Sequence, residues 1–245
     1  MDPFVPILQS SVDRFAAVLR DGPLDAPVAG CPGWDVHRLA RHLGYVQRWA
    51  RLAVTTGASP DPAAIDELGD DAAAVELLDW FVTGASALVD VFVGLDPSAP
   101  TWHPFPVPQV AAVWPRRQAH EAFVHAWDAE AAVGPTSALD PTVAADGVAE
   151  YFEVMVPRRI ARDGTPAPVG VLEVACTDAR FHSGSDRMVV RVDDPTHVVV
   201  DPTARPTGRL AGGAEELLLG LWARRPVAGA PTDPLARAWL AHGGN

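Results

Sequence analysis

Apolar positions in the first 160 residues recur at the three- and four-residue spacing of amphipathic helices. One such stripe begins at Phe4 and ends before Gly22 and Pro23, a pair that terminates helices. Later stripes predict helices over residues 35–57, 71–93, 115–133 and 141–159, with Asp35 as the N-cap of the second. The prolines of residues 96–108 argue against regular structure there. The pattern therefore predicts an up-and-down bundle of four long helices, with a fifth leading out of it.

Beyond residue 164 the pattern changes from helical spacing to short β-branched runs. Residues 169–176, 187–192 and 197–200 are separated by turn residues, which is typical of antiparallel strands. Residues 214–224 then predict one more helix. The predicted fold class is α+β: a helical bundle over residues 1–160, followed by a small α/β domain with an antiparallel sheet over residues 161–245.

Net charge, hydropathy and cysteine content limit which partners the protein binds and in which cellular compartment it works. The formal net charge of −12 argues against nucleic acid or an anionic membrane as a partner. No apolar run is long enough to span a bilayer, and no signal peptide is evident at the N-terminus. The two cysteines, Cys31 and Cys176, form no disulfide framework. We therefore expect a cytoplasmic protein, although the charge does not identify a substrate; many such bundles are monomers or homodimers.

The fourth predicted helix carries a pair of candidate metal ligands. Glu121 and His125 are four residues apart, so their side chains lie on one face and can reach one ion. On the second helix His42 falls inside the apolar arc, whereas His37 points the opposite way. Glu121 and His125 could instead lie on a solvated helix face, and His42 could be a core histidine that bonds a backbone carbonyl or a carboxylate. His120, which lies within the apolar arc of its helix, is an equally good candidate by periodicity alone.

Other reactive side chains have two interpretations each. Cys31 and Cys176 are better explained as small buried residues than as nucleophiles, because no base is identifiable beside Cys31. Asp128 is suited either to orienting a ligand histidine or to bonding a neighbouring helix. His103, in the proline-rich segment, is a weaker candidate for the mouth of a site.

Three motifs resemble a known family. The sequence reads CPGWDV at residues 31–36 with LARHL at 39–43, HEAFVHAWDAE at 120–130 and DGVAE at 146–150. In order and spacing these are similar to motifs of the mycothiol-dependent maleylpyruvate isomerase family, within the DinB-like bundle superfamily. The resemblance implies a divalent metal, typically zinc, bound by His42, Glu121 and His125. The ligand set would also suit nickel, cobalt or iron.

The resemblance also implies a reaction. Three protein ligands leave a zinc position open, as in catalytic sites, and family members use mycothiol, a low-molecular-weight thiol, whose thiolate attacks an electrophilic small molecule. We expect an isomerase or S-transferase of this kind. Arg224 and Arg225, at the end of the last predicted helix, would bind carboxylates of substrate or cofactor; alternatively they are exposed charges at a helix C-terminus. The alternative functions are a hydrolase that uses metal-activated water and a non-catalytic metal-binding module.

Overall fold

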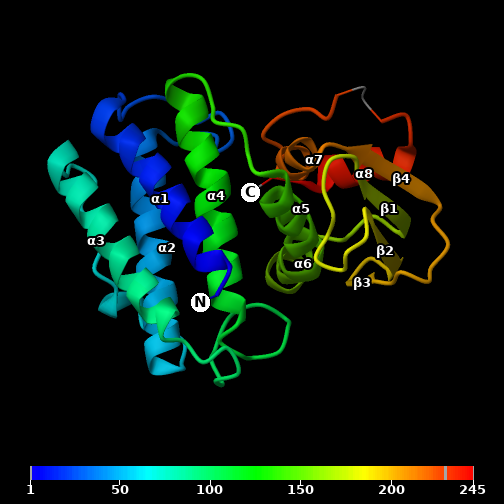
Figure 1. Cartoon of the computed structure of the whole chain (residues 1–245), viewed down its shortest axis with the longest axis horizontal. Helices are drawn as coiled ribbons and strands as arrows, with labels where there is room; N and C mark the ends of the chain where they lie inside the picture. The colour runs from blue at the N-terminus through cyan, green and yellow to red at the C-terminus, as the bar shows by residue number, and fades with distance from the viewer. Residues whose placement is uncertain (1, 229–230, 245) are drawn as a thin grey trace. The chain divides into compact units, whose positions relative to one another are not determined.

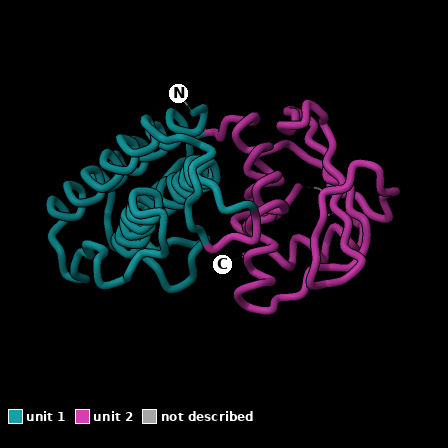
Figure 2. The backbone as a smooth tube through the Cα atoms, turned by 90° about the horizontal axis from the view of Figure 1, so that it is seen from below, with its two compact units in different colours: residues 1–103, 108–137 teal, residues 104–107, 138–245 magenta. Residues whose placement is uncertain are grey.

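The computed structural model describes residues 2–228 and 231–244, which form two compact units. Unit 1 comprises residues 1–103 and 108–137, and unit 2 comprises residues 104–107 and 138–245 (Figure 2). The division falls after Ser137, whereas the sequence led us to expect it near residue 160. The helical segment that begins at Pro141 packs on helix α7 (Ala214–Leu221) of unit 2, and periodicity cannot reveal which partner a helix covers.

Unit 1 is built from four long helices (Figure 1). These are α1 (Phe4–Asp21), α2 (Val36–Thr56), α3 (Ala74–Val93) and α4 (Val113–Val133), with a short 3-10 turn at Pro62–Ala64. The predicted stop and start signals operate as expected. The Asp35 carboxylate accepts the backbone N–H of Arg38 at 2.7 Å, and Gly57 ends α2 with a φ of 69° in the left-handed region.

The helix directions differ from the up-and-down arrangement that we expected. Phe4 contacts His120 and Arg14 pairs with Glu130, so α1 and α4 run parallel. Contacts of Gly44 with Trp80 and of Arg48 with Gly84 likewise make α2 and α3 parallel. Residues 57–73 form a connection long enough to return along the whole of α2. Consecutive helices α2 and α3 can therefore run in the same direction. The four-helix bundle is confirmed, but its topology is up-down-down-up.

Two glycines allow α2 and α3 to pack closely. A Cβ on Gly44 would lie 2.2 Å from the ring of Trp80, and one on Gly84 would lie 2.0 Å from Arg48. The guanidinium of Arg48 stacks on Trp80 at 3.8 Å from the ring centroid and donates to the Trp80 carbonyl oxygen at 2.7 Å. This packing fixes Trp80 against the first half of α2, beside His42.

Unit 2 contains a four-stranded sheet in the order β3-β2-β1-β4. Its strands are β1 (Gly170–Cys176), β2 (Arg187–Asp194), β3 (His197–Val200) and β4 (Gly208–Gly212). The three predicted strands pair antiparallel, as expected. The sheet is nevertheless mixed, because β4 pairs parallel with β1. β4 was not predicted, since a five-residue strand rich in glycine lacks the β-branched pattern.

Helices complete unit 2. The segment predicted as one helix over residues 141–159 comprises α5 (Pro141–Glu150), a π-helical turn at Tyr151–Met155 and α6 (Val156–Asp163). After the sheet come α7 and α8 (Pro234–His242), of which α8 packs on β1 and β4 and was not predicted. The α+β fold class is thus confirmed. Within the described residues no helix is both long and apolar enough to cross a membrane.

Candidate metal centre

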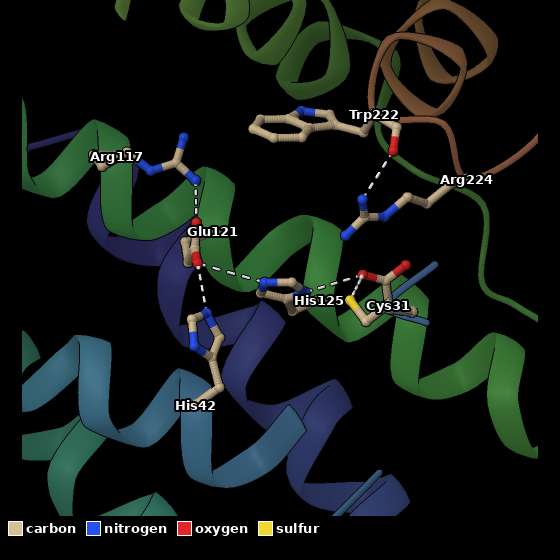
Figure 3. Close-up of polar contacts among 8 residues, drawn as sticks. Cys31, His42, Arg117, Glu121, His125, Trp222 and Arg224 are labelled. Atoms are coloured by element: carbon tan, nitrogen blue, oxygen red, sulfur yellow. Dashed lines mark hydrogen bonds and ion pairs between the residues drawn. The ribbon is translucent and has the colours of Figure 1, made fainter. Parts of the chain in front are cut away.

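Two helices of unit 1 bring three potential ligands together. His42 lies in the second turn of α2, and Glu121 and His125 lie one turn apart on α4. Figure 3 shows both imidazole rings directed at the carboxylate of Glu121. Glu121 Oε1 lies 3.3 Å from His42 Nε2 and 3.4 Å from His125 Nε2. The two rings are nearly perpendicular, with centroids 5.5 Å apart, and the ligand atoms of the three residues lie within 4.8 Å of one another.

Burial and neighbouring charges shift the pKa values of Glu121 and His125 in this cluster. Although burial raises the pKa of Glu121, the Arg117 guanidinium and the two histidines hold it well below its ordinary value. For His125, burial lowers the pKa, but hydrogen bonds to Asp128 and Glu121 outweigh burial and raise the pKa to about 9. The Glu121 carboxylate is therefore ionised and His125 is protonated at neutral pH when no cation is bound.

Two further residues fix the orientation of these side chains. Arg117, four residues before Glu121, forms an ion pair with the second carboxylate oxygen, Oε2 (Figure 3). Asp128 Oδ2 lies 2.9 Å from His125 Nδ1 and accepts a hydrogen bond from it. Of the two roles that the sequence left open for Asp128, the geometry favours orienting the ligand histidine. Arg117 was not predicted, although its four-residue spacing from Glu121 is the same signal that identified His125.

The donor set and its spacing fit a tetrahedral divalent metal. Ligand atoms bound to one zinc at about 2.1 Å lie about 3.4 Å from one another in a tetrahedron. The distances from Glu121 Oε1 to the two histidine nitrogens are 3.3 and 3.4 Å. The imidazole of His42 remains 34 % exposed, which leaves one side accessible to water or to a ligand. A carboxylate and two imidazoles form a catalytic rather than a structural set.

A second group could also hold a metal, and it shares His125. Cys31, Asp128 and His125 bring one ligand atom each within 4.8 Å, and all three are buried. The Cys31 thiol lies 3.9 Å from Asp128 Oδ2. This group would use Nδ1, the nitrogen that binds Asp128, and would leave no exposed side for a substrate. The set of His42, Glu121 and His125 is therefore the better candidate for a reactive centre.

The rival histidines lie elsewhere. His120 is buried against Phe4 of α1, with ring centroids 5.8 Å apart. His37 Nε2 contacts the carbonyl oxygen of Ala72 at 3.2 Å. His103 bonds Gln109 and the Pro108 carbonyl oxygen inside the proline-rich segment, where it shapes the loop.

Arg224, Arg225 and Cys176, the other candidate residues from the sequence, all lie in unit 2. Arg224 donates to the Trp222 carbonyl oxygen at 2.8 Å (Figure 3), and Arg225 forms an ion pair with Glu215 at 3.1 Å. Cys176 is buried at the end of β1, where burial, then Asp178 and Asp186, raise the pKa of its thiol to about 12. A thiol with that pKa is a poor nucleophile at neutral pH.

Solved structures with the same fold exist. A mycothiol-dependent maleylpyruvate isomerase superposes with a TM-score of 0.60 at 13 % identity, covering 95 % of this chain and 92 % of that one. A variant of that enzyme with one histidine replaced by alanine gives a TM-score of 0.61 at 12 % identity, with the same coverage. At this identity the likeness concerns the fold. None of the curated proteins matches the sequence.

The sequence itself supplies the family. The pattern that defines the mycothiol maleylpyruvate isomerase N-terminal domain matches residues 6–130, about half of the chain. The matched segment includes most of α1, all of α2 and α3 and most of α4, with all three candidate ligands. The chain therefore belongs to the mycothiol maleylpyruvate isomerase family of enzymes.

Proposed function

We propose that this protein is a metal- and thiol-dependent isomerase that acts on a small, maleylpyruvate-like electrophile with mycothiol as its thiol cofactor. The observation that carries the proposal is the placement of His42, Glu121 and His125, whose ligand atoms lie within 4.8 Å of one another, with Glu121 Oε1 at 3.3 and 3.4 Å from the two histidine nitrogens. The family supports mycothiol and the class of substrate. Zinc is the proposed metal because the donors are nitrogen and oxygen in a tetrahedral arrangement.

The surrounding side chains prepare these ligands. His125 would hold a metal through Nε2, which must be unprotonated to do so, while Nδ1 keeps its proton and its hydrogen bond to Asp128. Arg117 balances the charge on the remaining oxygen of Glu121 and keeps that carboxylate in place. A divalent metal held here would favour the thiolate form of a thiol at its open position.

The chemistry of isomerisation belongs to the thiol and the substrate. Addition of the thiolate sulfur to one alkene carbon converts the double bond into a single bond. Rotation about that bond and loss of the same thiolate then give the other isomer, with no net change in atoms. An S-transferase would differ by keeping the new carbon–sulfur bond. We further propose that Arg224 contacts a carboxylate of the substrate or cofactor, and that Arg225, paired with Glu215, contributes less.

Thiol dependence separates this function from metal-assisted hydrolysis. Zinc-loaded protein should isomerise maleylpyruvate only when mycothiol is present, and the substitutions His42→Ala, Glu121→Gln and His125→Ala should each remove turnover. His37→Gln is the matched control, because His37 lies on the same helix but bonds the Ala72 carbonyl. Turnover that is equal without any thiol would favour hydrolysis, and a protein that binds zinc but shows no turnover with or without thiol would favour the non-catalytic metal-binding module.

A further inference from the structure

A pocket of about 270 Å³ lies beside the candidate metal centre, entirely within unit 1. One wall is a stripe of α2 that consists of Arg38, Arg41, His42 and Tyr45, which are spaced so that they share a helix face. His42 therefore belongs to both the pocket and the ligand cluster. The connection between α2 and α3, together with Trp80 of α3, forms the opposite wall. Any molecule that occupies this pocket lies next to a proposed metal ligand.

The arginines around the pocket differ in what they already bind. Arg41 donates to the Leu68 carbonyl oxygen at 2.8 Å and pairs with Asp70, so it is used in holding the connection in place. Arg48 is buried and bonds the Trp80 carbonyl oxygen. The guanidinium of Arg38 forms no hydrogen bond or ion pair among the described residues, and it lies over the ring of Trp34 at 5.0 Å from the ring centroid. Its guanidinium N–H groups are available to an anion.

Aromatic side chains hold Arg38 and its surroundings in a defined geometry. Trp34 lies between Arg38 and His42, and its ring packs edge-on against His42 with centroids 4.9 Å apart. Stacking on an indole restricts the guanidinium while leaving its N–H groups able to bind a carboxylate at two points. Trp80 is fixed by its packing on Gly44 and by a 3.2 Å bond to Asp66.

A second hydrogen-bond donor faces the same space. Partial burial, and then the charge of Glu67, raise the pKa of Tyr45, so its hydroxyl remains protonated at neutral pH. The pocket thus combines the free guanidinium of Arg38, the Tyr45 hydroxyl and two indole rings, with the Glu67 carboxylate on the Tyr45 side. That combination suits a flat, unsaturated molecule that carries a carboxylate.

We propose that this pocket binds the unsaturated carboxylate substrate, with Arg38 as the residue that binds its carboxylate and Trp34 as the residue that positions Arg38 relative to His42. The proposal rests on the proposed function in that it assigns the electrophile, not the thiol, to this side of His42. Unlike Arg224, Arg38 is in the same compact unit as the proposed metal ligands.

Calorimetric titration of the zinc-loaded protein with maleate tests the assignment. We expect Arg38→Gln to weaken maleate binding by about tenfold or more, the loss typical of a charge-assisted pair. Arg38→Lys should restore part of the affinity, because a lysine keeps the charge without the planar fork. Arg51→Gln, the same charge change on the same helix outside the pocket, should bind as the wild type does. The uncharged diamide of maleate should bind wild type and Arg38→Gln equally weakly.

Kinetics and metal content separate this inference from the proposed function. In Arg38→Gln we expect a higher KM for the electrophile, with kcat, the KM for mycothiol and zinc content unchanged. Maleate binding that is absent in the wild type, or equal in wild type and Arg38→Gln, would overturn the pocket assignment even if thiol-dependent turnover is found. Loss of maleate binding in Arg38→Gln would support the assignment even if the protein shows no turnover with mycothiol.

Discussion

Each unit of the protein contains a histidine held between two carboxylates, and the two clusters differ in what surrounds them. In unit 1, His125 has Glu121 at Nε2 and Asp128 at Nδ1, at 3.4 and 2.9 Å. In unit 2, His182 has Glu153 at Nε2 and Asp146 at Nδ1, at 3.4 and 3.7 Å.

The difference lies in burial and in a second histidine. The His125 side chain is 9 % exposed and that of His182 is 52 % exposed. Only in unit 1, among the described residues, does a further histidine, His42, share the carboxylate. An exposed histidine between two carboxylates is an ordinary surface ion pair. A buried one that shares a carboxylate with a second histidine has the donors of a candidate metal site. The predictions below test this contrast.

The largest difference is expected when each central histidine is removed. His125→Ala should lose stoichiometric zinc binding and all turnover, because it deletes one of three ligands. His182→Ala should retain both. Zinc content of the dialysed proteins, measured by elemental analysis, gives the comparison directly. Equal zinc content in the two variants would show that the His125 cluster is not the metal site.

Metal removal should affect stability through the same residues. A metal that binds only the folded state at 100 times its Kd stabilises that state by about 2.7 kcal/mol. We expect chelation to lower the Tm of the wild type and to leave the Tm of His42→Ala unchanged. Differential scanning calorimetry with and without a chelator measures both, and an equal shift in the two proteins would contradict the prediction.

Asp128 should act through His125 rather than on the metal itself. Replacing the partner of a ligand histidine costs about 10- to 100-fold in metal affinity, and we expect this from Asp128→Asn, measured by competition with a chromogenic chelator. The matched change in unit 2, Asp146→Asn, should leave metal affinity unaltered. If Asp128→Asn bound zinc as tightly as the wild type, the 2.9 Å contact would be structural only.

A partly buried ion pair of unit 1, between Arg14 and Glu130, predicts a pH dependence of stability. Burial raises the pKa of Glu130, but hydrogen bonds from Arg14 and from the Ser137 backbone lower it overall. A carboxyl whose pKa is lower when folded stabilises the protein above its unfolded pKa and loses that contribution as pH falls through the folded pKa. Arg14→Gln should therefore cost about 1 kcal/mol at pH 7 and progressively less below about pH 4.5.

Urea unfolding at pH 7 and pH 3.5 measures this dependence. Arg20→Gln serves as the control, because Arg20 is an exposed arginine on the same helix that makes no ion pair among the described residues. The account fails at this point if the cost of Arg14→Gln grows as the pH is lowered.

The smallest effect is expected in unit 2. His182→Ala removes contacts of a half-exposed side chain with Glu153 and Asp146, and surface pairs of this kind contribute about 0–1 kcal/mol. A change in the free energy of unfolding above this range would mean that burial does not distinguish the two clusters as we infer.

Local signals in the sequence predicted the four long helices of unit 1 and paired two of the three candidate ligands. Asp35 and Gly57 marked both ends of α2, and the four-residue spacing paired Glu121 with His125. Periodicity could not choose between His120 and this pair, because α4 is buried on most of its faces. The contact of His120 with Phe4 depends on α1 and α4 running parallel, and helix direction is set by long connections rather than by the stripes themselves.

Other features were beyond the reach of the sequence. The parallel pairing of β4 with β1 and the ion pair of Arg225 with Glu215 depend on geometry that only the folded chain supplies, and so does the choice between the two roles that the sequence left open for Asp128. The same holds for Arg38, whose place in the pocket follows from the path of residues 57–73 across α2. Family resemblance supplied the third ligand, His42, where the helical wheel left a core histidine equally acceptable.

X-ray absorption spectroscopy of the zinc-loaded protein, recorded without any thiol, tests the central claim most directly. The account predicts only nitrogen and oxygen neighbours at about 2.0–2.2 Å, with the outer-shell signature of two imidazoles. His42→Ala should remove one imidazole from that signature. A sulfur neighbour at about 2.3 Å would place the metal at Cys31, Asp128 and His125 instead, and would contradict the assignment of His42, Glu121 and His125.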